Sequence, residues 1–148
     1  MPQNWNDKLE SAQKMLPLLH KLHRTNNVVT SIFGRLLIDV TDIDIVKAHR
    51  YSRLATETEL SPSDTLPVLE ALTELDLGTA SIDLGRLAVK YHQVGGDLNE
   101  FLRTELSEAI GGESSTQSRD VVLYGFGRIG RLLARILISR EAAYGSVK

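Results

Sequence analysis

Along the first 110 residues, apolar side chains recur every three or four positions, the spacing that places one apolar stripe on one side of a helix. The first such stripe, within residues 6–23, consists of Leu9, Ala12, Leu16, Leu19 and the borderline His23. Pro17 lies inside this helix and has no N–H to donate to the carbonyl of Gln13, so we expect a kink or a break there.

Two further helices are predicted before residue 60. Asn27 follows the first helix and is a suitable N-cap for the second. The apolar positions of the second helix are Val29, Ile32, Phe33, Leu36 and Leu37. Thr41 is the predicted N-cap of the third, in which Asp42 and Asp44 complement the positive end of the helix dipole. We expect this third helix to run to about Thr58.

Three more helices follow, each bounded by turn or capping residues. The fourth follows the turn at residues 61–64 and extends to Gly78, and the fifth starts at Ser81 and Asp83. The fifth helix is predicted to end at Gly95 and Gly96. The sixth is predicted to begin at its cap, Asp97, and to end at Gly111 and Gly112. Residues 6–110 therefore predict a mainly α domain of about six helices, with hardly any of the alternation that is typical of a strand.

The composition changes at Gly111. Residues 111–118 contain no apolar side chain and are predicted to be a flexible linker. Residues 119–124 form a short β-branched and aromatic run that is typical of a buried parallel strand. Residues 128–140 then predict an amphipathic helix, with its apolar face at Ile129, Leu132, Leu133, Ile136 and Leu137 and its cationic face at Arg128, Arg131 and Arg135.

The turn between this strand and this helix carries a complete G-x-G-x-x-G motif. Its members are Gly125, Phe126, Gly127, Arg128, Ile129 and Gly130. In a dinucleotide-binding turn, Gly125 permits the tight turn, Gly127 lets a pyrophosphate approach the backbone, and Gly130 lets the helix pack closely. The free N–H groups at the helix start face the phosphates. These six residues are the predicted cofactor-binding site, and a strand-to-helix turn without a ligand is the alternative.

Composition narrows the chemistry. The chain has 148 residues and a formal net charge of −2, so it lacks the basic footprint of a nucleic-acid-binding protein. It has no cysteine, which excludes disulfides, thiolate metal sites and a cysteine nucleophile within this chain. No basic and apolar leader opens the sequence and no apolar run approaches ~18 residues, so we expect a cytoplasmic protein without a membrane partner.

Residues 124–132, Tyr-Gly-Phe-Gly-Arg-Ile-Gly-Arg-Leu, closely resemble the opening of glyceraldehyde-3-phosphate dehydrogenases. The generic fingerprint leaves several positions open that this family fills in the same way, namely Phe126, Arg128, Ile129 and Arg131. The short form of the family has Asn where this chain has Tyr124. Tyr124 and the long preceding helical segment resemble the N-terminally extended bacterial class, as do residues 30–35 and 47–50.

The resemblance implies NAD or NADP as cofactor, held by the backbone of Phe126, Gly127, Arg128 and Ile129, a homo-oligomeric intact enzyme and a phosphorylated triose aldehyde as substrate. The family's catalytic cysteine and histidine have no counterpart here, so no catalytic residue is assigned. An acidic residue for the ribose is expected ~20 residues past the glycines, and only 18 residues follow Gly130. We therefore interpret the chain as a helical extension (1–110), a linker (111–118) and a truncated Rossmann start (119–148).

This chain by itself is expected to be inactive and to bind cofactor very weakly or not at all, since a helix N-terminus contributes only about 0.3–2 kcal/mol to anion binding. The alternative function is a helical interaction or regulatory module without catalysis.

A metal site at His20 and His23 is not assigned because no third ligand is evident. His49, Arg50 and Arg53 could form an anion site on the third helix, but a solvated helix face is the preferred interpretation.

Overall fold

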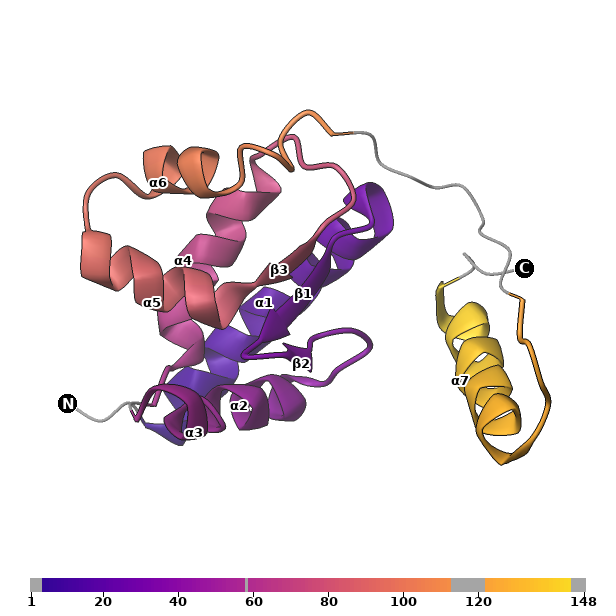
Figure 1. Cartoon of the computed structure of the whole chain (residues 1–148). Coiled ribbons are helices and arrows are strands. Elements are labelled where there is room, and N and C mark those ends of the chain that lie inside the picture. The colour runs from indigo at the N-terminus through magenta and orange to yellow at the C-terminus, as the bar shows by residue number, and fades with distance from the viewer. Residues whose placement is uncertain (1–3, 58, 113–121, 145–148) are drawn as a thin grey trace. The chain divides into compact units, whose positions relative to one another are not determined.

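The computed structural model describes residues 4–57, 59–112 and 122–144, and the chain divides into two compact units (Figure 1). The first unit is Met1–Ser114 and the second is Ser115–Lys148. Helices dominate the described residues, so the prediction of a mainly α chain is confirmed.

Within its described residues, the first unit combines helices with one small sheet. The helices are α1 (Trp5–Asn26), α2 (Asp42–Arg50), α3 (Arg53–Thr56), α4 (Pro62–Thr73), α5 (Leu84–Val94) and α6 (Leu98–Glu105). The strands are β1 (Val29–Ile32), β2 (Arg35–Leu36) and β3 (Ser81–Asp83). The strand order in the sheet is β2-β1-β3.

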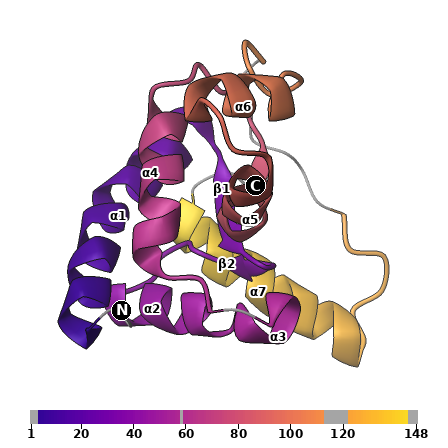
Figure 2. The same ribbon diagram turned by 90° about the vertical axis from the view of Figure 1, so that its left-hand side faces the viewer.

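The longest helix of this unit, α1, lies beside α4 and also packs against α2 (Figure 2). Its buried face consists of Ala12, Met15, Leu19 and Leu22. The helix is continuous through Pro17, so the prediction of a break is wrong. Pro17 is exposed, and water can hydrate the carbonyl of Gln13 that lacks its helical donor. Met15 and Leu19, buried on either side of Pro17 in the sequence, hold both halves of the helix in the core.

Residues 29–36 form two strands, so the predicted second helix is wrong. β1 pairs antiparallel with β2 and parallel with β3. Asn27 is likewise not an N-cap: its φ is 53°, and its N–H donates to the carbonyl of His23 at 3.0 Å, which ends α1. Thr30, Ser31 and Ile32 are all buried in β1, a consecutive run that one face of a helix cannot bury.

The hairpin turn is fixed by a carboxylate from the third strand. Phe33 and Gly34 have φ values of 46° and 80°, the left-handed backbone of a tight hairpin. Their N–H groups donate to the two carboxylate oxygens of Asp83 at 3.0 and 2.9 Å. Asp83 Oδ1 also accepts the N–H of Arg86 at 3.1 Å and so caps α5. One side chain therefore joins β3, the hairpin turn and the start of α5.

The predicted third helix is present but divided into α2 and α3. Thr41 and Asp44 form the predicted capping box at its start. Ser52, between the two helices, is completely buried, and its Oγ accepts the N–H of Leu60 at 2.7 Å. Glu57, with a φ of 60°, ends α3 just before the predicted end of the third helix. A buried serine that binds a later backbone N–H explains why the chain turns here.

The fourth, fifth and sixth predicted helices correspond to α4, α5 and α6. Ser61 and Asp64 form a capping box on α4, and Asp97 caps α6 by accepting the N–H of Glu100. Ser81 and Asp83 were predicted to open the fifth helix. Asp83 is the N-cap of α5, which confirms that start, whereas Ser81 belongs to β3, the strand that leads directly into α5.

After α6, the chain returns to the loop that follows α4. The sixth helix ends at Glu105 rather than near residue 110, and Ile110 forms an isolated antiparallel bridge with Leu77. Gly78 donates its N–H to Ala109 at 2.8 Å. A Cβ on Gly78 would lie 2.6 Å from the carbonyl carbon of Gly112, so only glycine permits this approach.

In the second unit, the predicted amphipathic helix is confirmed as α7 (Arg128–Tyr144). Of the predicted strand at residues 119–124, residues 122–124 are described and are not in a strand, and the others lie outside the described residues. Most of the predicted linker, residues 113–118, also lies outside them. Among the described residues, no helix combines the length and apolar character that crossing a membrane requires.

Candidate dinucleotide-binding turn

The glycine motif forms a tight turn that enters α7. Gly125 has a φ of 96°, which favours glycine, and α7 begins three residues later at Arg128. The first helical hydrogen bond runs from the N–H of Arg131 to the carbonyl of Gly127 at 3.0 Å. The N–H groups of the first helical turn therefore have no acceptor within the helix and are available to an anion.

The second and third glycines of the motif have different surroundings. A Cβ on Gly130 would lie 2.3 Å from the carbonyl oxygen of Gly125, so the helix and the turn can approach only at glycine. At Gly127, in contrast, no atom of the described residues lies within 4 Å of the position of a Cβ. The open space at Gly127 fits the role of admitting a phosphate to the backbone.

The side chains around this turn are exposed. A hollow is lined by every residue of the motif except Phe126, together with Val122, Leu123, Tyr124 and Leu133. Phe126 and Ile129 are 68% and 75% exposed. Arg128 and Arg131 are exposed too, and among the described residues neither forms an ion pair. The six predicted site residues thus span the turn and the first residues of α7, with Arg128 among them and Arg131 directly after them.

His49, which the sequence groups with Arg50 and Arg53, is separated from them. His49 is 1% exposed, with Nδ1 2.7 Å from the carbonyl oxygen of Ile45 and Nε2 2.7 Å from Oγ1 of Thr65. Only an Nδ1–H can donate to the Ile45 carbonyl, so Nε2 accepts the Thr65 hydroxyl in the neutral ring. Burial lowers the pKa of His49 to about 4. His49 is therefore a neutral core residue and does not bind an anion.

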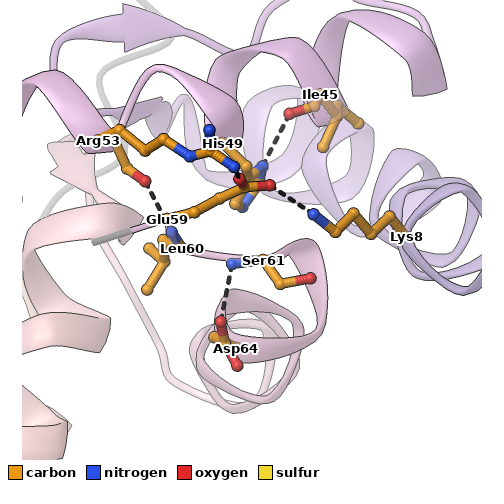
Figure 3. A network of polar contacts seen from close by, with 9 residues as sticks. Lys8, Ile45, His49, Arg53, Glu59, Leu60, Ser61 and Asp64 are labelled. Atoms are coloured by element: carbon orange, nitrogen blue, oxygen red, sulfur yellow. Dashed lines mark hydrogen bonds and ion pairs between the residues drawn. The ribbon is translucent and has the colours of Figure 1, made fainter. Parts of the chain in front are cut away.

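Arg53 belongs to a small ionic network beside this histidine (Figure 3). Glu59 accepts from both Lys8 and Arg53, so it joins the N-terminal part of α1 to α3. The hydrogen bond from Lys8, assisted by the one from Arg53, lowers the pKa of Glu59. Arg53 and Arg50 also line a hollow with Lys47, Tyr51 and Leu54.

The sequence did not show which other residues would surround these arginines. The Cζ of Arg35, on β2, lies 3.3 Å from the centre of the Tyr51 ring, a cation–π contact between a hairpin and a helix end. Leu54 is 84% exposed although it lies in a helix. The sequence could not indicate the contact between Arg35 and Tyr51, because it predicted a helix where Arg35 lies in a hairpin.

The two histidines of α1 were considered as metal ligands. His20 is exposed on α1 and His23 is half-buried near its end. No cluster of three or more His, Cys, Asp or Glu side chains suited to a metal ion occurs in the described ranges.

No family model matches the chain. The chain is 50% identical over 132 residues to a protein of Pseudomonas aeruginosa (strain UCBPP-PA14) named glyceraldehyde-3-phosphate dehydrogenase-like protein. That alignment covers 85% of this chain and 29% of the relative, so the chain spans less than a third of the relative's length. The match extends well beyond the glycine motif into the helical unit, because 132 residues far exceed the motif and its neighbours. The chain is therefore related to the glyceraldehyde-3-phosphate dehydrogenase-like proteins.

Proposed function

We propose that this chain supplies the pyrophosphate-binding turn of an NAD- or NADP-dependent glyceraldehyde-3-phosphate dehydrogenase of the N-terminally extended bacterial class. In this proposal, residues 1–110 are the helical extension, residues 111–118 are a linker and residues 119–148 begin the dinucleotide-binding domain. The intact protein is a cytoplasmic homo-oligomer that converts a phosphorylated triose aldehyde through an enzyme thioester and hydride transfer.

This proposal is carried by the difference in the space around Gly127 and Gly130. Gly130 lies in close contact with the turn, where a Cβ would lie 2.3 Å from Gly125 O, whereas Gly127 faces open space. A turn without a ligand needs the first property and has no use for the second. A pyrophosphate needs both, because it must approach the backbone at Gly127 while the helix N-terminus stays in place.

When bound, the nicotinamide cofactor supplies the hydride acceptor or donor. The chain's own contribution is to bind and orient: backbone N–H groups of Gly127, Arg128 and Ile129 donate to phosphate oxygens, and the exposed guanidinium of Arg128 adds positive charge nearby. The chain has no cysteine and therefore offers no thiol to form the thioester. The reacting groups belong to sequence beyond these 148 residues.

The size of the interaction limits what this chain binds alone. An anion at a helix N-terminus gains about 0.3–1 kcal/mol, or about 2 kcal/mol when partly buried, whereas even a 1 mM complex requires about 4.1 kcal/mol. We therefore expect the turn to contribute to a site that other segments complete.

Calorimetric titration with NADH and NADPH tests the proposal on the intact gene product and on the 148-residue chain in parallel. We expect binding by the intact product, loss of that binding in Gly127→Ala, and retention in the control Ser139→Thr, which adds a methyl group at an exposed position of α7. Because a Cβ at Gly127 meets no described atom, Gly127→Ala should fold normally by circular dichroism. Unchanged binding in a folded Gly127→Ala protein contradicts the assignment.

The second candidate is an interaction or regulatory module, favoured by the closed core of the helical unit. Reading the gene past the codon for Lys148 separates the two. Continuation into a domain that contains cysteine supports the dehydrogenase. Micromolar binding of either cofactor by the 148-residue chain would instead mean that the helical unit completes a nucleotide site.

A further inference from the structure

The junction of α2 and α3 carries a surface that is both cationic and apolar, which we call the basic corner. It is the hollow lined by Lys47, Arg50, Tyr51, Arg53 and Leu54. Leu54 is 84% exposed and Tyr51 is 46% exposed, so apolar area faces solvent between the charges. Exposed apolar side chains that lie together within a polar rim mark interaction surfaces, and Tyr51 and Leu54 line this hollow together.

The positive charge of the basic corner is only partly neutralised. Among the described residues, Arg50 forms no ion pair, and Lys47 approaches only Asp44, at 3.9 Å. Arg53 is paired with Glu59. Lys47 lies on α2 and Arg53 on α3, so the cations are spread over two helices instead of converging on one point. That spread suits an extended acidic surface better than a single small anion.

A surface of the opposite character lies at the junction of α5 and α6, which we call the acidic hollow. It is lined by Val94, Asp97, Glu100, Phe101, Thr104 and Glu105, together with two glycines. Val94 is 67% exposed, which gives this hollow an apolar contact of its own. Lys90 pairs with Glu105 at 2.7 Å, and Glu100 forms no ion pair among the described residues. Glu100 is thus an unpaired carboxylate beside an exposed apolar residue.

The two surfaces lie at opposite ends of the helical unit. In both views α6 is at the top, and α2 and α3 are at the bottom (Figures 1 and 2). The basic corner of one molecule therefore cannot contact its own acidic hollow, but it can contact that of a second molecule.

We propose that the occupant of the basic corner is the acidic hollow of a second copy of this chain. In the contact, Lys47 and Arg50 face Glu100, and Leu54 packs against Val94. The two patches are different surfaces of the same molecule, so the contact is head-to-tail, and an open assembly keeps a free basic corner at one end and a free acidic hollow at the other. Charge complementarity supplies the orientation, and the exposed leucine and valine supply the apolar contact.

Two charge reversals test the proposal through mutual rescue. The corner variant is Lys47→Glu with Arg50→Glu, and the hollow variant is Glu100→Lys with Thr104→Lys. Each variant alone brings like charges together, whereas a mixture restores both an original contact and a charge-swapped one. Asp97 is left unchanged because it caps α6, and Glu105 because it pairs with Lys90.

Sedimentation velocity of the full 148-residue chain measures the association over a concentration series. We expect the wild-type mass average to rise with concentration at low salt and to fall towards the monomer in about 1 M NaCl, where the Debye length is about 3 Å. The association constant of each variant alone should be lower than that of the wild type by a factor of about ten or more. An equimolar mixture of the two variants should recover the wild-type association. The control Lys21→Glu, on an exposed part of α1, should not differ from wild type.

Other outcomes overturn the proposal. Association that neither reversal weakens would place the contact elsewhere, for instance on the exposed apolar residues of α7. A monomeric wild type at all concentrations, or a mixture that fails to recover association while both variants keep the wild-type circular dichroism, would also exclude this contact. Wild-type binding of inorganic phosphate that the corner variant loses, without self-association, would assign the basic corner to a small anion.

Discussion

In the core of the helical unit, the Nε2 atom of His49 lies 2.7 Å from the hydroxyl of Thr65, which joins α2 to α4 through a side-chain hydrogen bond. Thr65 Oγ1 also lies 3.2 Å from the carbonyl oxygen of Pro62 and 3.8 Å from the sulfur of Met15. The three helices α1, α2 and α4 thus meet around one polar cluster inside a mainly apolar core.

This cluster predicts loss of stability in mild acid. Burial lowers the pKa of His49 to about 4, below the unfolded value of about 6.5. The stabilisation by the neutral ring is complete above pH 6.5 and is lost as the pH falls towards 4, because the unfolded chain binds the proton more tightly. The shift corresponds to about 3 kcal/mol of unfolding free energy. Urea unfolding at pH 7 and at lower pH measures it.

Two histidine variants identify the group responsible for that pH dependence. In His49→Gln the unfolding free energy should be lower at pH 7 but should lose most of its dependence between pH 6.5 and 4.5. The exposed His92→Gln should behave as wild type. An equal acid sensitivity in wild type and His49→Gln would assign the effect to carboxylates instead.

Asp83→Asn should destabilise the helical unit by about 1–3 kcal/mol, because it weakens charge-assisted hydrogen bonds from three backbone N–H groups. The same substitution at the exposed Asp39 should change stability by less than about 0.5 kcal/mol. Denaturant midpoints and slopes compare the two variants. A loss in Asp39→Asn as large as in Asp83→Asn would contradict this explanation.

Gly78→Ala should weaken the contact between the loop after α4 and the segment that follows α6. Its Cβ would lie 2.6 Å from the backbone of Gly112, and backbone atoms on both sides leave little freedom to move. At Gly112 the corresponding contact is 3.4 Å, so Gly112→Ala is the matched tolerated change. We expect faster amide hydrogen exchange at residues 106–112 in Gly78→Ala, and exchange close to wild type in Gly112→Ala.

A chain that ends at Gly112 should fold with an unchanged unfolding midpoint. The buried residues of the helical unit all lie between Ala12 and Leu102, so its core closes before that point. Thermal unfolding followed by circular dichroism compares the shortened and full chains. A large loss of helical signal from residues 1–112 would show that later residues belong to the core.

The helices and their caps were predictable because their signals are local. The apolar period and caps at Thr41, Ser61 and Asp97 lie within a few residues of each helix start. The hairpin was missed because the apolar residues between Val29 and Leu37 fit a helical period, while the contacts that select the sheet come from Asp83, 50 residues later than Phe33. Local spacing cannot contain that information.

The glycine turn was predictable as a pattern because each glycine has its own steric reason. That Gly127 faces open space required the structure. The cluster of arginines near residue 50 was predictable from the sequence. The burial of His49 was not, because the face of α2 that packs on α4 depends on where α4 lies.

The hydrogen bonds of Asp83 also constrain how the helical unit folds. The amides of Phe33 and Gly34 reach their carboxylate acceptor only when a segment 49 to 50 residues later arrives, so the hairpin cannot gain its full stability by local collapse. The entropy cost of closing a loop of that length precedes the stabilising contacts, so this unit should fold more slowly than a bundle of neighbouring helices. The sheet should therefore form late, in the same step that docks α5, and the unit should cross its main barrier with the helices already assembled.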